Sequence, residues 1–275
     1  MAAALPQLTT HSDIEALVMT LVQSGGRIQP VEWEGQRAWL KLSVPQPPAW
    51  RYQLLAGMAR LIRQPALQPV RPDGGVTGIR NEIARITALS VAGVRVPPLL
   101  AHADGWLLIA DLGHTTLESL IRHADADMQL KYWQLGADYI AQVHRSGQYL
   151  SQAFARNLVW SPEAGLGAID FEDDPVSIMS LDQAQIRDWL PYFFSTAIHF
   201  KHRLPILCSS IHTVLSYETP AVRAGVILAL RRTAWLRALR WLPRRMQRRD
   251  VLKTQCYGEL ARVCGYRGIV TKEPV

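Results

Sequence analysis

Residues 144–172, HRSGQYLSQAFARNLVWSPEAGLGAIDFE, decide how the fold of this chain is interpreted. A helical pattern over 130–144 leads into a loop that contains Gln152 and Asn157, and a short apolar strand then ends at Asp170. Carboxylate and amide oxygens are the ligands that Mg²⁺ prefers in proteins. The stretch therefore predicts a polar, metal-binding pair formed by a loop and the end of a strand.

Upstream of this stretch, the sequence predicts a hairpin followed by a helix. The strands are expected at Arg27–Trp33 and Arg37–Val44, and the helix at Gly78–Ala92. Lys41 lies inside the second apolar strand, where an ammonium group without a partner is costly to bury. Glu82 lies beside the apolar stripe of the helix and is the candidate partner. Phosphoryl transfer uses such a cation for nucleotide phosphates and a carboxylate to orient it.

The other elements complete an α+β pattern. A helix is expected over Ser12–Gln23, with Ser12 or Asp13 as its N-cap and Gly25-Gly26 at its end. The Pro-, Gly- and Arg-rich segment 45–78 is interpreted as an insertion with a helix at Arg51–Ile62. Further strands are expected at 99–101, 106–112 and 166–171, and further helices at 117–123, 130–144 and across most of the chain after Pro175. Strands followed by helices indicate an α+β or two-lobed design.

Composition limits the class of protein. The chain has 275 residues, of which 48% are hydrophobic, so it is long enough for one domain of two lobes and too apolar for general disorder. Three cysteines without a CxxC pair argue against a disulfide framework or a structural zinc site and favour a reducing cytoplasm. We expect no signal peptide and no membrane span. A net charge of +7 favours anionic partners.

The order of these candidate residues resembles that of the protein-kinase-like superfamily. Lys41 on a strand precedes Glu82 on a helix, Asn157 in a loop and Asp170 at a strand end. The chain looks most similar to bacterial lipopolysaccharide-core and sugar kinases, with RIO- and aminoglycoside-phosphotransferase-like proteins. The resembling segments are 39–41, 81–84, 93–98, 108–113, 144–157 and 168–172, within a span of about residues 27 to 175.

The resemblance implies a bilobal protein-kinase-like fold. Residues 1–112 would form a small β-rich N-lobe, and residues 113–275 a larger helical C-lobe that contains the catalytic-like loop 144–175. The implied activity is ATP- and Mg²⁺-dependent transfer of a phosphoryl group to a hydroxyl of a sugar, lipid-linked sugar or lipopolysaccharide-core acceptor. In the implied site, Lys41 and Glu82 hold the nucleotide together with hinge residues Asp111 and Leu112, Asn157 and Asp170 bind Mg²⁺, and Gln152 meets the acceptor hydroxyl.

The sequence departs from the family pattern at three points. Gln152 replaces the aspartate of the catalytic loop, and an amide cannot act as a general base. No G-x-G-x-x-G loop is present, and the insertion separates Lys41 from Glu82. Asp173 and Asp174 are alternatives for the missing base, although two acids before Pro175 are more typical of charges at a helix N-terminus. The alternative function is a pseudokinase with a regulatory or scaffolding role in envelope lipid metabolism.

Other candidates have simpler interpretations. Lys41 alone is compatible with an edge-strand lysine that reaches water. His144 is interpreted as a hydrogen-bonded structural histidine. His199 and His202 are three positions apart, but no third metal ligand is evident. Arg156 is a candidate contact for an anionic acceptor.

The segment Arg223–Lys253 is strongly basic, with ten Lys or Arg residues and only Asp250 as an acid. Its apolar residues recur at near-helical spacing, although Pro243 interrupts the pattern. This pattern indicates either a helix on an anionic membrane surface or a C-lobe helix with solvated arginines. We therefore expect a cytoplasmic protein, with peripheral binding to the inner face of the cytoplasmic membrane or a membrane adaptor role as hypotheses, and no nucleic-acid partner.

Overall fold

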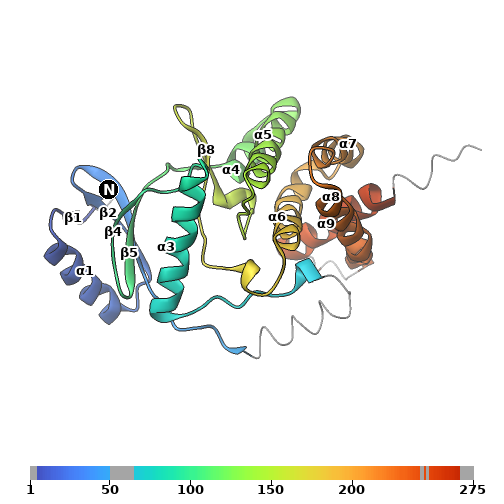
Figure 1. Ribbon diagram of the computed structural model, residues 1–275. Helices are drawn as coiled ribbons and strands as arrows, with labels where there is room; N and C mark the ends of the chain where they lie inside the picture. The colour runs from blue at the N-terminus through green and yellow to red at the C-terminus, as the bar shows by residue number, and fades with distance from the viewer. Residues whose placement is uncertain (1–4, 50–64, 242–244, 246–247, 267–275) are drawn as a thin grey trace, which may run out of the picture.

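The protein has a small β-rich part followed by a larger helical part (Figure 1). The computed structural model describes residues 5–49, 65–241, 245 and 248–266. The predicted α+β class, with a small sheet before a mainly helical region, is confirmed. Among the described residues, no helix combines the length and the hydrophobicity that crossing a bilayer requires.

The β-rich part contains a twisted sheet whose strands run in the order β1-β2-β3-β5-β4. These strands are β1 (Gln7–Leu8), β2 (Ile28–Trp33), β3 (Gln36–Leu42), β4 (Leu99–Ala103) and β5 (Trp106–Ala110). The pairing of β1 with β2 is parallel, and the other pairings are antiparallel. Helices α1 (His11–Ser24) and α3 (Gly75–Val91) cover opposite faces (Figure 1).

Helix α1 begins earlier than the sequence suggested. Its N-cap is Thr10, whose hydroxyl accepts a hydrogen bond from the Asp13 amide at 3.2 Å. The Asp13 carboxylate accepts one from the Thr10 amide at 2.8 Å. This reciprocal pair is a capping box, so the prediction of Ser12 or Asp13 as the cap is wrong. The helix ends at Gly25, whose positive φ of 71° suits glycine.

The sides of β3 explain why it can carry a lysine. Leu40 and Leu42 are buried in the small core that also contains Ile14 and Leu21 of α1. Because side chains alternate along a strand, Lys41 points to the opposite face, toward α3. Helix α3 begins at Gly75 rather than Gly78. The expected helix Arg51–Ile62 lies outside the described residues, and the short 3-10 helix η1 (Pro65–Leu67) follows it.

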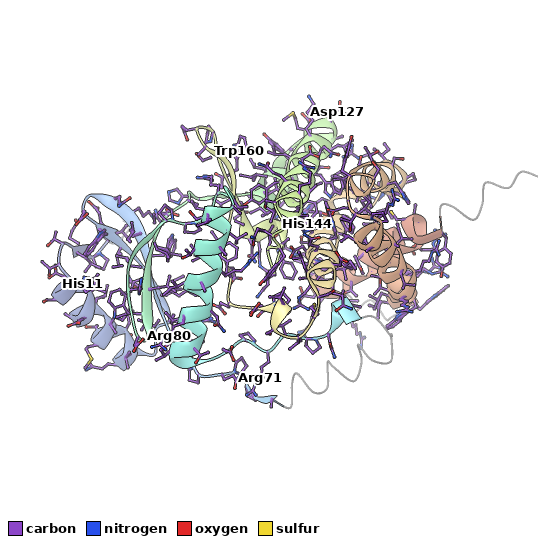
Figure 2. The ribbon with its side chains drawn as sticks, viewed as in Figure 1. His11, Arg71, Arg80, Asp127, His144 and Trp160 are labelled. Atoms are coloured by element: carbon purple, nitrogen blue, oxygen red, sulfur yellow. The ribbon has the colours of Figure 1, made fainter. Side chains whose placement is uncertain are left out.

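The helical part surrounds a second and larger core that includes Trp133, Trp189 and Phe193. Its helices are α4 (Leu117–His123), α5 (Ala126–Arg145), α6 (Leu181–Thr196), α7 (Leu204–Leu215), α8 (Pro220–Thr233) and α9 (Arg249–Tyr266). A small sheet of β6 (Thr115–Thr116), β7 (Leu158–Ser161) and β8 (Gly165–Ala168) lies beside them. Figure 2 shows His144 inside this part.

Two boundaries in the helical part differ from expectation. Helix α5 begins at Ala126, four residues before the predicted start, because the Asp125 carboxylate caps the amides of Asp127 and Met128. Strand β8 ends at Ala168 because Asp170 has a φ of 74°, which cannot continue an extended strand.

The basic segment 223–253 does not form one continuous helix in its described residues. Helix α8 ends at Thr233, and the 3-10 helix η5 (Ala234–Trp241) follows it before α9 begins at Arg249. Residues 242–244 and 246–247, including Pro243 and Met246 of the predicted pattern, lie outside the described residues. Trp235 and Trp241 are 53% and 76% exposed, whereas Leu230 of α8 lies in the core.

Candidate functional site

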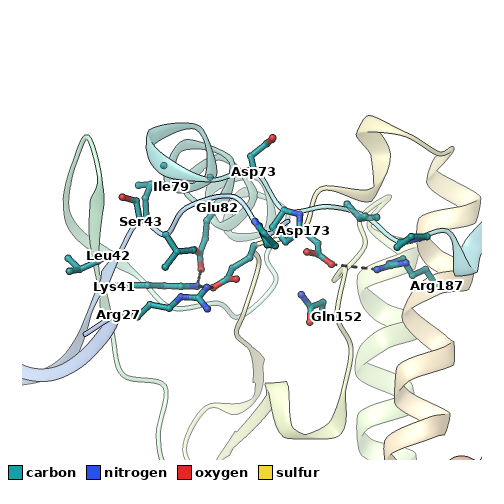
Figure 3. Close-up of a pocket in the computed structure, with 18 residues that line it drawn as sticks. Arg27, Lys41, Leu42, Ser43, Asp73, Ile79, Glu82, Gln152, Asp173 and Arg187 are labelled. Atoms are coloured by element: carbon teal, nitrogen blue, oxygen red, sulfur yellow. Dashed lines mark hydrogen bonds and ion pairs between the residues drawn. The ribbon is translucent and has the colours of Figure 1, made fainter. Parts of the chain in front are cut away.

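The site is centred on Lys41, which two carboxylates hold (Figure 3). Its Nζ lies 2.7 Å from Glu82 Oε1 and 2.8 Å from Glu172 Oε1. Lys41 is 8% exposed and Glu82 3%. Burial alone lowers the Lys41 pKa, but attraction to the two carboxylates outweighs it and raises the pKa above the ordinary value. The side chain is therefore an ammonium ion at neutral pH, and the structure brings it together with Glu82 across the insertion.

Glu172 is the partner that sequence reasoning missed. Its carboxylate binds Lys41 and also Arg27, which precedes β2. Burial raises the Glu172 pKa, but Lys41 and Arg27 lower it by more, so the net shift of the pKa is downward. The available signal was an acid two positions after Asp170 in the sequence. Glu172 therefore joins the helical part to the β-rich part through a pair of charged contacts.

Asn157 and Asp170 lie together on the other side of this cluster. The Asn157 Nδ2 donates to Asp170 Oδ2 at 3.3 Å and to the Gln152 carbonyl at 3.0 Å. These bonds use the amide hydrogens, so the Asn157 amide oxygen is the atom of this side chain that could bind a metal. The positive φ of Asp170 is a sparsely populated conformation, and such strain is frequent at functional sites.

The donor set of Asn157 and Asp170 fits Mg²⁺, which binds few protein oxygens and completes its shell with phosphate and water. Within the described ranges, no group of three or more His, Cys, Asp or Glu side chains is placed to hold a metal by itself. His199 is half-buried and His202 is exposed, and neither belongs to such a group.

A cavity of about 410 Å³ lies between the sheet and the helical part, and Lys41, Asn157 and Asp170 all line it. Its apolar wall consists of Ile28, Pro97, Ile109, Leu112, Val159 and Ile169. Asp111 lines the same cavity, but its carboxylate accepts hydrogen bonds from Trp39 Nε1 and the Gly113 amide, each at 3.1 Å. Asp111 thus fixes the shape of the wall between the two parts.

A second cavity of about 450 Å³ shares Lys41 and Glu172 with the first and extends to Gln152 and Asp173. Asp173 Oδ2 lies 3.5 Å from Arg187 Nη2 of α6, and the Gln152 side chain lies near this pair (Figure 3). Burial raises the Asp173 pKa to about 6, since repulsion from nearby acids adds to burial and Arg187 only partly offsets it. A carboxylate with a pKa near 6 accepts a proton readily at neutral pH.

The acids before Pro175 precede a short helix, as predicted, but their carboxylates contact other residues. The 3-10 helix η3 (Pro175–Ser177) receives no side-chain cap from Asp174. The Asp174 carboxylate instead accepts a hydrogen bond from the Tyr149 hydroxyl at 2.9 Å, and Asp173 binds Arg187. Both residues therefore belong to the contacts around the loop, which favours the interpretation of Asp173 as a site residue.

A buried hydrogen-bond network around His144 supports the loop that contains Gln152. His144 Nδ1 lies 2.7 Å from Glu218 Oε1, and its Nε2 lies 3.2 Å from Asp188 Oδ2. Asp188 Oδ2 also accepts from the Leu150 amide at 2.6 Å. Burial lowers the His144 pKa, but the two acids raise it by more, so the net shift is upward. The prediction of a hydrogen-bonded structural histidine is confirmed, while its acidic partners were not foreseen.

Two arginines contact the loop from outside this network. Arg85 of α3 donates to Gln148 Oε1 at 2.9 Å and to the Tyr149 carbonyl. Arg156 is exposed, with its guanidinium 4.2 Å from the centre of the Phe154 ring. Arg85 therefore ties the β-rich part to the loop, whereas Arg156 is accessible to a ligand.

No protein-family model matches the chain, and no curated protein matches it. The assignment of a function therefore depends on the chemistry of these side chains.

Proposed function

We propose that the protein transfers the γ-phosphoryl group of ATP to a hydroxyl group of a small acceptor, with Mg²⁺. The observation that carries the proposal is the composition of one cavity. Lys41, held by Glu82 and Glu172, lines it together with Asn157 and Asp170. A fixed cation for phosphates next to oxygen ligands for Mg²⁺ is the combination that phosphoryl transfer requires.

The lining of this cavity suggests how the nucleotide would be oriented. The base would lie against the apolar wall near Ile109 and Leu112, and the phosphates would reach Lys41. A helix, α1, connects β1 to β2 in place of a glycine-rich hairpin, and Arg27 at the end of that connection lines the cavity. Arg27 would therefore contact the phosphates that a glycine-rich loop covers elsewhere.

The acceptor would approach from the second cavity, where Gln152 and Asp173 lie. Gln152 would orient the acceptor hydroxyl by a hydrogen bond, and Asp173 would take its proton. The acceptor oxygen then forms a bond to the γ-phosphorus as the bond from phosphorus to the ADP oxygen breaks. Bound Mg²⁺, held by Asn157 and Asp170, would neutralise charge on the phosphate oxygens.

The second cavity has charged and amide side chains in its lining, among them Lys41, Gln152, Asp173 and Arg187, and these support an acceptor rich in hydroxyl groups. This agrees with the sugar, lipid-linked sugar or lipopolysaccharide-core acceptor that the family resemblance implies. Because ATP is an intracellular substrate, the reaction would take place on the cytoplasmic side of the membrane.

The second candidate function is that of a pseudokinase, and one contact favours it. Glu172 already occupies the Lys41 ammonium group, so nucleotide phosphates must displace or share this carboxylate. The Gln152 amide also cannot act as a base. Such a pseudokinase would bind nucleotide without transferring phosphate, or bind no nucleotide, and would have a scaffolding or regulatory role in envelope lipid metabolism.

A thermal-shift titration with ATP and Mg²⁺ distinguishes the two functions, since a ligand of the folded state raises the melting temperature. Wild type, Lys41→Ala and Asp170→Asn are compared. A metal-dependent shift that both variants lose supports the enzyme, and no shift at millimolar ATP supports the pseudokinase. In a turnover assay, Asp170→Asn is expected to abolish activity and Gln152→Ala to reduce it less, and an Asp170 variant with full activity contradicts the metal role.

A further inference from the structure

A third cavity, of about 460 Å³, lies in the helical part and is separate from the apolar wall that would receive the nucleotide base. Its lining is mainly apolar and includes Ala66, Leu67, Phe154, Leu190, Phe194 and Leu236. The volume falls within the range of about 300–1,000 Å³ that is typical of ligand pockets. We call it the apolar chamber. Neither nucleotide binding nor phosphoryl transfer, as proposed above, uses its apolar lining.

The apolar chamber shares part of its lining with the second cavity, which has more charged side chains. Gln152, Asp173 and Arg187 line both of them. These three residues therefore form the boundary between a polar compartment, which also contains Lys41, and an apolar one. The boundary is also where the acceptor hydroxyl would lie.

A site with one polar and one apolar compartment fits a ligand with the same two ends. Gln152, Asp173 and Arg187 offer hydrogen-bond donors and acceptors to a hydroxyl-rich head group. The chamber offers only weakly polar surface beyond them, so a free sugar leaves it unfilled. A hydrocarbon chain fills it and is removed from water, which is favourable for each methylene buried.

We propose that the apolar chamber binds the hydrocarbon chain of a single-chain glycolipid, with its sugar head at Gln152, Asp173 and Arg187. The acceptor is then an amphiphile whose hydroxyl is close to its chain. The binding part of this inference stands alone, while the role of the ligand as an acceptor rests on the proposed function. Trp235 lines the chamber and is 53% exposed, so this part of the lining is accessible from solvent or from a membrane.

The binding test uses hexyl, octyl and decyl glucoside below their micelle concentrations, with glucose as the head-group control. Affinity is measured by calorimetry without nucleotide. We expect affinity to rise about fourfold for each added methylene until the chamber is full. Affinity that is independent of chain length, or no binding of decyl glucoside, overturns the proposal.

Two variants place the chain in this chamber. Leu236→Asp puts a charge on one wall, and Ala66→Leu adds volume on another without adding charge. Both are expected to weaken decyl glucoside binding at least tenfold. The matched control is Leu228→Asp on α8, which changes a 40% exposed leucine outside the chamber lining and is expected to bind normally. Equal weakening in the control, or normal binding in both chamber variants, overturns the location.

The same proteins are titrated with ATP and Mg²⁺ to separate this inference from the proposed function. A chamber variant that loses decyl glucoside but keeps its nucleotide shift supports a distinct chain site. Transfer of phosphate to decyl glucoside in preference to glucose supports the acceptor role, and equal transfer to both overturns it. If the wild-type protein binds decyl glucoside but shows no nucleotide shift, the proposed function is contradicted and the chain site remains supported.

Discussion

The Glu172 carboxylate forms ion pairs with two cations, Lys41 and Arg27. Both cations are expected to contact phosphate when nucleotide binds, so Glu172 competes with the ligand. We predict that Glu172→Gln binds ATP and Mg²⁺ about tenfold more tightly than wild type, because a neutral amide gives weaker contacts to both cations. Calorimetric titration measures the change.

The control for this prediction is Glu163→Gln, in the exposed turn between β7 and β8, where the carboxylate accepts from the Ser161 hydroxyl. It is expected to leave nucleotide affinity unchanged. Weaker binding by Glu172→Gln contradicts competition and makes Glu172 an organiser of the phosphate site.

Asp173 leads to a specific prediction about the pH dependence of turnover, because burial raises its pKa to about 6. A protonated carboxyl cannot accept the acceptor proton, so turnover is expected to fall as pH decreases through about 6. Asp173→Asn should lose turnover by about a hundredfold or more, as for other general bases, and should keep nucleotide binding. Asp182→Asn, an exposed acid in the first turn of α6, is the control for both measurements. Wild-type turnover in Asp173→Asn would exclude the base role.

At the scale of elements, the sequence was sufficient where a pattern is local. Apolar periodicity and glycine positions predicted β2, β3, α3 and α4 within a few residues. The capping box of α1 was misplaced because both Ser12 and Asp13 are good cap residues. Thr10 is the N-cap because of the position at which the chain leaves β1. The periodicity of apolar residues gives no information about that position.

Long-range contacts set the limit of prediction. The candidate pair Lys41 and Glu82 was available because each residue departs from its local apolar pattern. The two acids that contact His144 could not be predicted. Asp188 lies in α6 and Glu218 follows α7, and no local sequence pattern indicates that they share a partner. The sequence favoured a helix-end charge for Asp173. Its place in a cavity with Arg187 and Gln152 depends on long-range packing, which the local sequence does not show.

The packing of α5 against α6 makes a testable contribution to stability through His144. Its pKa is raised in the folded protein, so the unfolded chain releases its proton at lower pH than the folded one. The contribution of His144 is therefore complete below the ordinary histidine pKa of about 6.5 and is lost as pH rises through the folded value. We predict that the free energy of unfolding falls over this range in wild type.

Urea denaturation of wild type and His144→Gln, from about pH 6 to about pH 9, tests the contribution of this histidine. The variant should be less stable near pH 6 and should lack this pH-dependent decrease. His123→Gln, at the exposed end of α4, is the control and should retain it. The same slope in wild type and His144→Gln would show that other groups cause it.

At the scale of the whole molecule, the proposed nucleotide site depends on contacts that cross between the two parts of the protein. Lys41 and Arg27 of the β-rich part reach Glu172, and Arg85 of α3 reaches the loop at Tyr149. A change in their relative position would alter these contacts at the same time as the cavity between them. Nucleotide binding and the arrangement of the two parts are therefore expected to be coupled.

The charge of +7 is distributed unevenly, since the segment 223–253 contains ten basic residues and one acid. Its η5 helix also exposes Trp235, which lines the apolar chamber, and Trp241. Arginines beside exposed tryptophans favour an anionic membrane surface. We predict that the protein sediments with phosphatidylglycerol vesicles and only a little with phosphatidylcholine vesicles, and that the bound fraction decreases as salt increases.

Trp241→Ser should weaken binding to phosphatidylglycerol vesicles roughly tenfold, since the indole would otherwise bury apolar surface at the interface. Tyr217→Ser, which changes a 64% exposed aromatic between α7 and α8, should bind as wild type. Binding that ignores lipid charge, or equal effects of the two substitutions, would contradict a membrane contact through η5.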